Sequence, residues 1–296
     1  MTSFEDQHFG RTTVLMAEDG GKYPDGNSLL VTGDTQSVLI DPALGLTKRV
    51  SLPRVDRILH SHCHEDHFAG SYLFPDVPWH YHEADAPSAR SLDAVMGLYG
   101  YPLEIDAAWR ERLVEKFNFV PCEEPVPFRN GDIFDLGGCS LRVVHLPGHT
   151  WGHCAFHILP DDVLYLGDIE LSSFGPYYGD ACGDLVEFER SLAAVRDFQA
   201  THYATFHHIG VLDREGFLAR LDKFVAKIGS REQALLAFLK EPRSMDEIVD
   251  HRFVFRPGDE LLYADSVERH SMSLHLERLM ASGGVEQIDG GRYLAR

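Results

Sequence analysis

The octapeptide HSHCHEDH, which begins at residue 60, is the feature that most restricts how this chain can fold. It continues the run VDRILH, whose apolar residues predict a β-strand. Alternate residues of an extended chain project to the same side, so His62 and His64 can approach one metal ion. Asp66 and His67 lie beyond the turn and can reach a second ion. Imidazole and carboxylate ligands suit Zn²⁺, Mn²⁺ or Fe²⁺.

Three more polar residues follow predicted strands in the same way. They are His149 in LPGHTWGH, Asp168 in YLGD and His207 in ATFHHIG. Strand ends are rigid points from which a fold can present catalytic groups. Position directly after the strand favours His207, and the adjacent His208 is the alternative. With the H-x-H-x-D-H motif, these residues predict a site for two metal ions.

The order of the predicted elements indicates an α/β domain followed by a helical tail. Apolar runs between Gly, Asp and Asn turns predict strands at 12–17, 28–32, 37–40, 55–60, 139–146, 154–158, 163–166 and 203–206. Helical spacing predicts a helical insert at about 83–120 and a helix at 185–199. Residues 1–229 are therefore assigned to the domain that carries the site. Residues 230–296 are assigned to a second unit, with helices predicted at 231–240, 244–250 and 265–282 and a hairpin at 285–294, and this order resembles a winged helix.

Composition excludes several classes of function. The chain has 296 residues and a net charge of −19, which opposes general binding to nucleic acid. No apolar run approaches the ~20 residues of a membrane span, and the N-terminal segment MTSFEDQHFG lacks the features of a secretory signal. Five scattered cysteines do not suggest a disulfide framework and fit a reducing cytoplasm.

These motifs, in this order, resemble those of the metallo-β-lactamase superfamily, in particular its glyoxalase-II-like hydrolases. The strand pair NSLLVT…SVLIDPA also resembles the opening of that family. The resemblance implies a four-layer αβ/βα sandwich with two metal ions at one edge of its two sheets, followed here by the small winged-helix-like C-terminal domain. It implies that one metal binds His62, His64 and His149, that the other binds Asp66, His67 and His207, and that Asp168 bridges them.

The sequence departs from the family pattern in one place, because the last histidine is often followed by Gly and here is followed by His208. Asp168 separates the chain from those lactamases that have a Cys ligand at that place, so hydrolysis of antibiotics is not favoured. Zinc is the first choice of metal, with iron or manganese as alternatives.

The predicted chemistry is hydrolysis by a metal-bound hydroxide, because a divalent cation lowers the pKa of bound water toward ~7. Asp66 and Asp168 are the predicted catalytic carboxylates, and Asp66 can accept a hydrogen bond from that hydroxide. Asp41 either accepts the N–H of a ligand histidine or caps a turn. The first hypothesis is a hydrolase of a small thioester, ester or lactone. The alternatives are a metal-dependent phosphodiesterase or ribonuclease, and a non-catalytic metal-binding regulator with a DNA-binding tail.

Residues beyond the metal site carry weaker signals. Glu170, Tyr177 and Tyr178 are candidates for lining the substrate pocket, with plain packing as the alternative for the tyrosines. Strand alternation predicts that Cys63 and Glu65 point away from the metals. The tail holds 12 acidic and 9 basic side chains, a net charge of −3, which disfavours a DNA-binding role. Packing over the active-site edge, or formation of a homodimer, is the favoured role for the tail.

Overall fold

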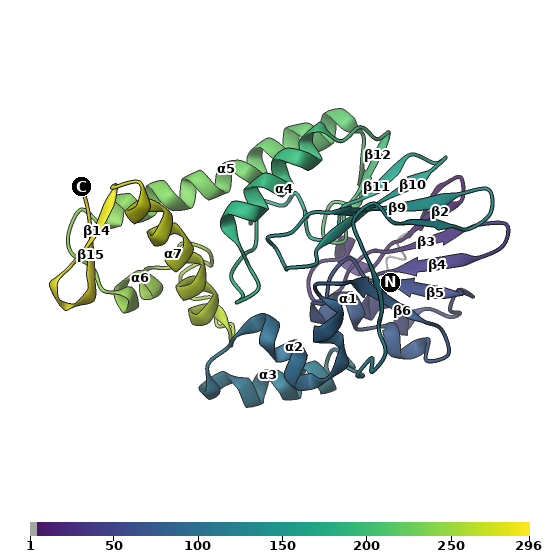
Figure 1. Ribbon diagram of the computed structural model, residues 1–296, viewed down its shortest axis with the longest axis horizontal. Helices are drawn as coiled ribbons and strands as arrows, with labels where there is room; N and C mark the ends of the chain where they lie inside the picture. The colour runs from purple at the N-terminus through teal and green to yellow at the C-terminus, as the bar shows by residue number, and fades with distance from the viewer. Residues whose placement is uncertain (1–4) are drawn as a thin grey trace.

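Two β-sheets form the centre of the molecule in the computed structural model, which describes residues 5–296 (Figure 1). The first sheet has seven strands in the order β1-β2-β3-β4-β5-β6-β7. Its strands are β1 (Gln7–Phe9), β2 (Thr12–Leu15), β3 (Ser28–Thr32), β4 (Ser37–Ile40), β5 (Arg57–Leu59), β6 (Trp79–His82) and β7 (Val126–Phe128). The second sheet has six strands in the order β13-β12-β11-β10-β9-β8. Its strands are β8 (Ile133–Asp135), β9 (Ser140–His145), β10 (Cys154–Leu159), β11 (Val163–Tyr165), β12 (His202–Ala204) and β13 (Val211–Leu212).

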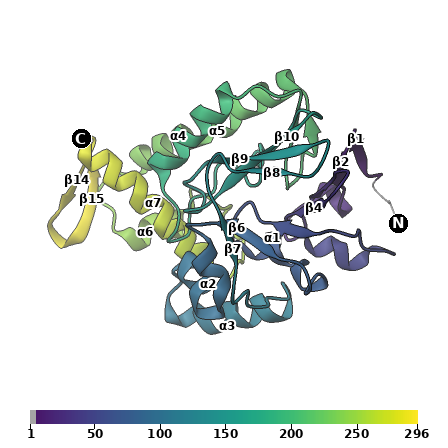
Figure 2. The same ribbon diagram turned by 45° about the vertical axis from the view of Figure 1, so that its right-hand side comes forward.

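Helices cover the outer face of each sheet, which gives the four layers that the family resemblance implied (Figures 1 and 2). On the first sheet lie α1 (Glu65–Phe68), α2 (Leu92–Tyr99) and α3 (Leu103–Glu115). On the second lie α4 (Leu185–Asp197) and α5 (Arg214–Phe238). The remaining elements are α6 (Met245–His251), α7 (Ala264–Ala281), the hairpin β14 (Val285–Ile288) and β15 (Arg292–Ala295), and five short 3₁₀ helices at 18–20, 44–48, 71–73, 86–90 and 289–291.

Three apolar clusters hold these layers together. The cluster between the sheets contains Val31 and Ile40 of the first sheet and Val143 and Phe156 of the second. A further cluster packs α2 and α3 on the first sheet, and another packs α4 and α5 on the second. Burial of apolar surface on both faces of each sheet provides the main stabilisation of such a sandwich.

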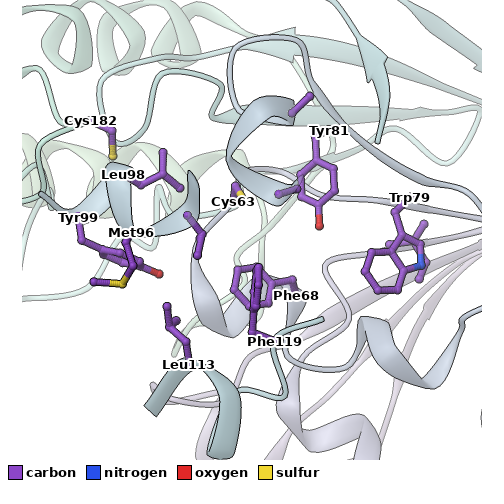
Figure 3. Close-up of a cluster of buried hydrophobic side chains, with 14 of the residues drawn as sticks. Cys63, Phe68, Trp79, Tyr81, Met96, Leu98, Tyr99, Leu113, Phe119 and Cys182 are labelled. Atoms are coloured by element: carbon purple, nitrogen blue, oxygen red, sulfur yellow. The ribbon is translucent and has the colours of Figure 1, made fainter. Parts of the chain in front are cut away.

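The cluster beneath α2 and α3 also holds the thiol of Cys63 (Figure 3). Cys63 is fully buried beside Phe68, Leu98 and other apolar side chains, so it points away from its two histidine neighbours. This orientation confirms the one predicted from strand alternation. The helical insert also forms as predicted: Ser91 caps the start of α2, and Gly100, with φ of +65°, ends it.

Helix α5 is longer than predicted, because it runs without a break from Arg214 to Phe238. The sequence had placed a helix at 231–240 after a break near Gly229, but buried Phe224, Ile228 and Leu235 continue one helical face across that position. The helix thus connects the sandwich to the C-terminal elements (Figure 1). The division of the chain into two units, and the winged-helix relation of the second, stay predictions.

None of the helices described, from residue 5 onward, is long and apolar enough to cross a membrane. The first four residues of the N-terminal segment that was compared with a secretory signal lie outside the described part of the chain.

Candidate metal centre

Four strand ends of the two sheets meet at the predicted site. His62 and His64 lie in the loop after β5, and His149 lies in the turn between β9 and β10. Asp168 follows β11, and His207 follows β12. Together with Asp66 and His67 of α1, these side chains form two adjacent groups of potential metal ligands: His62, His64, His149 and Asp168 in one, and Asp66, His67 and His207 in the other.

The first group is a triangle of imidazole nitrogens. His62 Nε2 lies 3.1 Å from His64 Nδ1 and 3.1 Å from His149 Nε2, and the last two atoms are 3.0 Å apart. Nitrogens bound to one tetrahedral zinc ion at ~2.0–2.1 Å lie ~3.3 Å apart, so the observed spacing matches a shared ion. Burial, with His67 nearby, lowers the pKa of His62 well below its ordinary value, which keeps that ring neutral as a ligand must be.

Asp168 faces both groups with its two carboxylate oxygens. Its Oδ2 is 3.3 Å from His149 Nε2, and its Oδ1 is 2.9 Å from His67 Nε2. In the second group, His207 Nε2 lies 2.9 Å from Asp66 Oδ2 and 3.7 Å from Asp168 Oδ1. A carboxylate with one oxygen toward each group is the arrangement expected of a bridging ligand.

Both carboxylates are held in the charged form. Burial disfavours the charge, but His67 and His207 outweigh burial and lower the pKa of Asp168 well below its usual range. The same two histidines lower the pKa of Asp66 against the effect of burial. Against the effect of burial, these carboxylates in turn raise the pKa of His67 well above its usual value and that of His207 to about 10, so a divalent ion would replace the protons of the two rings. Carboxylates and imidazoles are the donor set that such ions bind, so these residues fit a pair of them.

Oxygen acceptors fix the far ring nitrogens of several of these histidines. His149 Nδ1 lies 2.9 Å from the carbonyl oxygen of Tyr177, and His207 Nδ1 lies 2.8 Å from that of Gly21. A carbonyl oxygen can only accept, so each Nδ1 carries the proton and each Nε2 presents its lone pair to the centre. His64 is turned the other way, with Nδ1 toward the centre and Nε2 3.4 Å from Asp180 Oδ2.

Asp41 orients His67 from behind. Its Oδ2 lies 2.8 Å from His67 Nδ1 and accepts the hydroxyl protons of Ser61 and Tyr165, and its Oδ1 accepts the backbone N–H of Ser61. Of the two roles left open for Asp41, the geometry shows the contact with a histidine N–H. His153 Nε2 also lies behind the site and accepts the backbone N–H of Asp168.

The structure separates the two adjacent histidines after β12. His207 is buried and belongs to the second group, as the sequence favoured. His208 has a positive φ of +60°, is partly exposed and points toward Glu170, with 3.7 Å between His208 Nε2 and Glu170 Oε2. The reversal of the backbone at His208 turns its ring away from the metal ligands.

A cavity of about 400 Å³ lies over the two groups. Glu170 and Tyr177 line it, as predicted, and burial raises the pKa of Glu170 to about 7. Tyr178 does not line it, because its hydroxyl lies 2.9 Å from His275 Nε2 of α7 and it packs away from the metal residues. Most of the remaining wall is aromatic, and its members are Tyr23, Tyr99, Tyr101, Trp109, Phe174, Phe255 and Tyr263.

Glu65 is the clearest functional residue that sequence reasoning missed. It lines the cavity and accepts hydrogen bonds from Tyr23 at 2.9 Å and Tyr99 at 2.6 Å. The prediction that Glu65 points away was wrong because α1 begins at this residue, so strand alternation no longer applies beyond His64. The change from extended to helical chain was the signal that would have found it.

The C-terminal region supplies part of the cavity wall. The segment between α6 and α7 contributes Phe255, Asp259, Leu261 and Tyr263 to its lining. The carboxylate of Glu268 in α7 is fully buried and accepts the backbone N–H groups of residues 253, 254 and 255. The favoured role of the tail, packing over the active-site edge, is what the structure shows for this segment.

Sequence comparisons match the part of the chain that carries the site. A family model described as "Metallo-beta-lactamase superfamily" covers residues 23–207. Acyl-coenzyme A thioesterase MBLAC2 of Bos taurus is 30% identical over 221 residues, which cover 62% of this chain and 76% of that protein. A hydroxyacylglutathione hydrolase of Hyphomonas neptunium is 42% identical over 40 residues, 14% of this chain and 16% of that protein.

Solved structures match the chain over nearly its full length. A metallo-beta-lactamase family protein from Thermus thermophilus has a TM-score of 0.72 and 26% identity, and the match covers 97% of this chain and 99% of that one. A beta-lactamase domain protein from Burkholderia ambifaria has a TM-score of 0.70 and 19% identity, with 100% and 94% covered. The fold similarity therefore includes the C-terminal helical region as well as the sandwich.

Proposed function

Because the chain belongs to the metallo-β-lactamase superfamily and is a metal-dependent hydrolase, we propose that it hydrolyses small acyl thioesters, with esters and lactones as related substrates. The observation that carries the proposal is the cavity of about 400 Å³, with a largely aromatic wall, over the two ligand groups. A cavity of this size suits a small molecule. The two relatives above are named as an acyl-coenzyme A thioesterase and a hydroxyacylglutathione hydrolase, which supports placing thioesters first.

The residues of the site fit hydrolysis at a carbonyl carbon. Two divalent ions, for which we propose zinc, supply a water that ionises near neutral pH and a positive charge for the carbonyl oxygen. Asp168 holds the two ligand groups at a fixed separation through its two oxygens. Asp66 stays charged and is placed to accept a hydrogen bond from the attacking water. The far-nitrogen contacts of His149, His207 and His67 keep the rings in one orientation during turnover.

The thiolate of a thioester leaves more readily than an alkoxide, since thiols have a pKa of ~8.5. The aromatic part of the wall can pack on an acyl chain. The same wall disfavours the phosphodiesterase alternative, because the described lining residues include six carboxylates but only Lys22 as a lysine or arginine. A polyanionic strand would be repelled there.

The test is hydrolysis by the metal-loaded protein with and without a chelator. The panel contains an acyl-coenzyme A, an S-acylglutathione, an acyl lactone, a p-nitrophenyl ester, bis-p-nitrophenyl phosphate and a short RNA, and a thiol reagent detects the released thiol. We expect chelator-sensitive turnover of at least one thioester at a higher kcat/KM than any phosphodiester. Faster cleavage of the phosphodiesters would overturn the proposal.

A further inference from the structure

A second cavity, of about 610 Å³, adjoins the metal cavity. Lys22, Phe174, Phe255 and Asp259 line both cavities, so the two are contiguous along these side chains. The rings of Phe174 and Phe255 lie 5.7 Å apart, centroid to centroid, at this junction. A molecule with its carbonyl over the metal ligands can therefore extend past these two rings into the second cavity.

The charge of the second cavity is opposite to that of the first. Its described lining contains Lys22, Lys227, Arg231 and Arg256, and Asp259 is its one carboxylate. This is unusual in a chain whose net charge is −19. Basic side chains gathered in a cleft concentrate anions there, even where the surrounding surface is acidic.

Three of the four cations are free to meet a ligand. Lys22, Lys227 and Arg256 are exposed, and within residues 5–296 no carboxylate lies in ion-pair distance of them. The carboxylate of Asp259 accepts the backbone N–H of Arg256, so it caps its own loop. Four cations and one carboxylate therefore leave the cavity with a surplus of positive charge.

Hydrogen bonds with two buried charged side chains fix the segments that form the walls of this cavity. The guanidinium of the buried Arg231 in α5 donates to the carbonyl oxygens of Phe174 and Pro176 and to the hydroxyl of Tyr178. Arg231 is therefore committed to the loop that carries Phe174. On the other side, Glu268 holds the segment that ends at Phe255. A rigid wall means that little ordering is needed when a ligand binds.

We propose that the second cavity binds the anionic group, phosphate or carboxylate, carried by the thiol part of the substrate. This inference rests on the proposed thioesterase function and goes beyond it, since it assigns the leaving group a site of its own and makes Lys22, Lys227 and Arg256 residues that determine specificity. The acyl group then occupies the aromatic cavity, and the junction at Phe174 and Phe255 holds the neutral middle of the molecule.

The experiment compares thioesters that share one acyl group and differ in the charge of the thiol. The three thiols are coenzyme A, which carries phosphates, glutathione, which carries carboxylates, and the neutral N-acetylcysteamine. The variants are Lys227→Glu and the double variant Lys227→Glu/Arg256→Gln. The matched control is Lys223→Glu, which makes the same charge change one turn earlier on α5, at an exposed position outside the cavity.

We expect Lys227→Glu to lower the ratio of kcat/KM for the preferred anionic thioester to kcat/KM for the neutral one by about fivefold, mostly through KM, and the double variant to lower it further. Added salt should lower the same ratio in the wild type. Loss of preference for the coenzyme A ester alone identifies phosphate as the ligand, and loss for the glutathione ester alone identifies carboxylate. An unchanged ratio in both, or an equal fall in Lys223→Glu, would overturn the inference.

Calorimetry separates this inference from the proposed function. Free coenzyme A and glutathione are titrated into the metal-loaded wild type, Lys227→Glu and Lys223→Glu. If no thioester is hydrolysed, the proposed function fails, yet binding that weakens in Lys227→Glu and not in Lys223→Glu still supports an anion site. Absence of binding by either thiol to the wild type, or equal binding by all three proteins, overturns it.

Discussion

Replacement of Asp41 by asparagine should weaken metal binding without changing the fold around residue 41. The side chains have the same shape, and Asp41 is fully buried with a φ of +48°, a conformation that asparagine adopts readily. The effect of the variant therefore comes from the loss of the carboxylate charge and its hydrogen bonds, and not from a change of shape. An alanine at this position would add backbone strain and leave more donors unpaired.

The structure sets the size of the effect. Oδ2 of Asp41 faces His67 Nδ1 at 2.8 Å, the Ser61 hydroxyl at 2.5 Å and the Tyr165 hydroxyl at 2.8 Å. Both hydroxyls can rotate to other acceptors, whereas the ring of His67 loses a charged acceptor whichever way the new amide turns. A hydrogen bond to a charged group contributes ~1.5–3 kcal/mol and one to a neutral group ~0.5–1.5 kcal/mol. A loss of ~1–2 kcal/mol corresponds to roughly a fivefold to thirtyfold weaker metal affinity, which overlaps the ~10–100-fold range for residues that orient metal ligands.

The assay measures metal content in chelator-buffered solutions of zinc, together with kcat/KM at saturating zinc and the unfolding midpoint. The control is Asp161→Asn, because Asp161 also accepts two hydrogen bonds, from the backbone of Arg11 and the hydroxyl of Thr12, and contacts none of the seven predicted ligands. We expect Asp161→Asn to bind metal as the wild type does. Wild-type metal affinity in Asp41→Asn would refute the assignment of Asp41 as the residue that orients His67.

Three further outcomes are expected. Asp168→Asn removes the charge shared by the two ligand groups, so metal content by mass spectrometry and the hydrolysis rate should fall by orders of magnitude; full activity would exclude the two-metal arrangement. Glu268→Gln weakens three charge-assisted hydrogen bonds to the backbone of residues 253–255, so the free energy of unfolding in urea should fall by ~1–3 kcal/mol and KM should rise. An unchanged KM would show that this segment does not contribute to substrate binding. Burial lowers the pKa of four histidines to about 4, namely His60, His80, His82 and His275. The unfolded chain, with a His pKa of ~6.5, binds more protons below pH ~6.5, so the free energy of unfolding measured by urea titration should fall from pH ~6.5 to about pH 4, and less steeply in His80→Asn.

The ligand groups were accessible from the sequence because each lies within a few residues of a strand end. An apolar run such as VDRILH predicts a strand, and the end of that strand determines where the next side chains project. Local reasoning of this kind could not reach Glu65, whose direction depends on where α1 starts. It also missed β1, β6, β7, β8 and β13, because strands of two to four residues carry too few positions to form a pattern.

The lining of the cavity was mostly inaccessible from the sequence, for a different reason. Tyr23, Tyr99, Phe174 and Tyr263 come from four distant segments, and only the tertiary packing brings their rings to one cavity. Periodicity identifies which face of a helix is buried, but not which partner it meets. The same limit applies to α5, where the glycine at 229 suggested a break although the buried face continues through it.

Two buried charged side chains attach the C-terminal region to the cavity walls through backbone groups, and contacts of this kind leave no pattern in the sequence. Arg231 and Glu268 bind backbone groups in the cavity walls, and within the described residues neither forms an ion pair. A buried charge is costly unless hydrogen bonds satisfy it, so each of these side chains fixes its loop strongly. Backbone carbonyls and amides are present whatever the loop sequence, which means that the side chains of the loops, Phe174 and Phe255 among them, can change without loss of the attachment. It follows that this enzyme could alter its substrate by changes in these loops while the metal ligands, anchored on separate strand ends, keep their geometry.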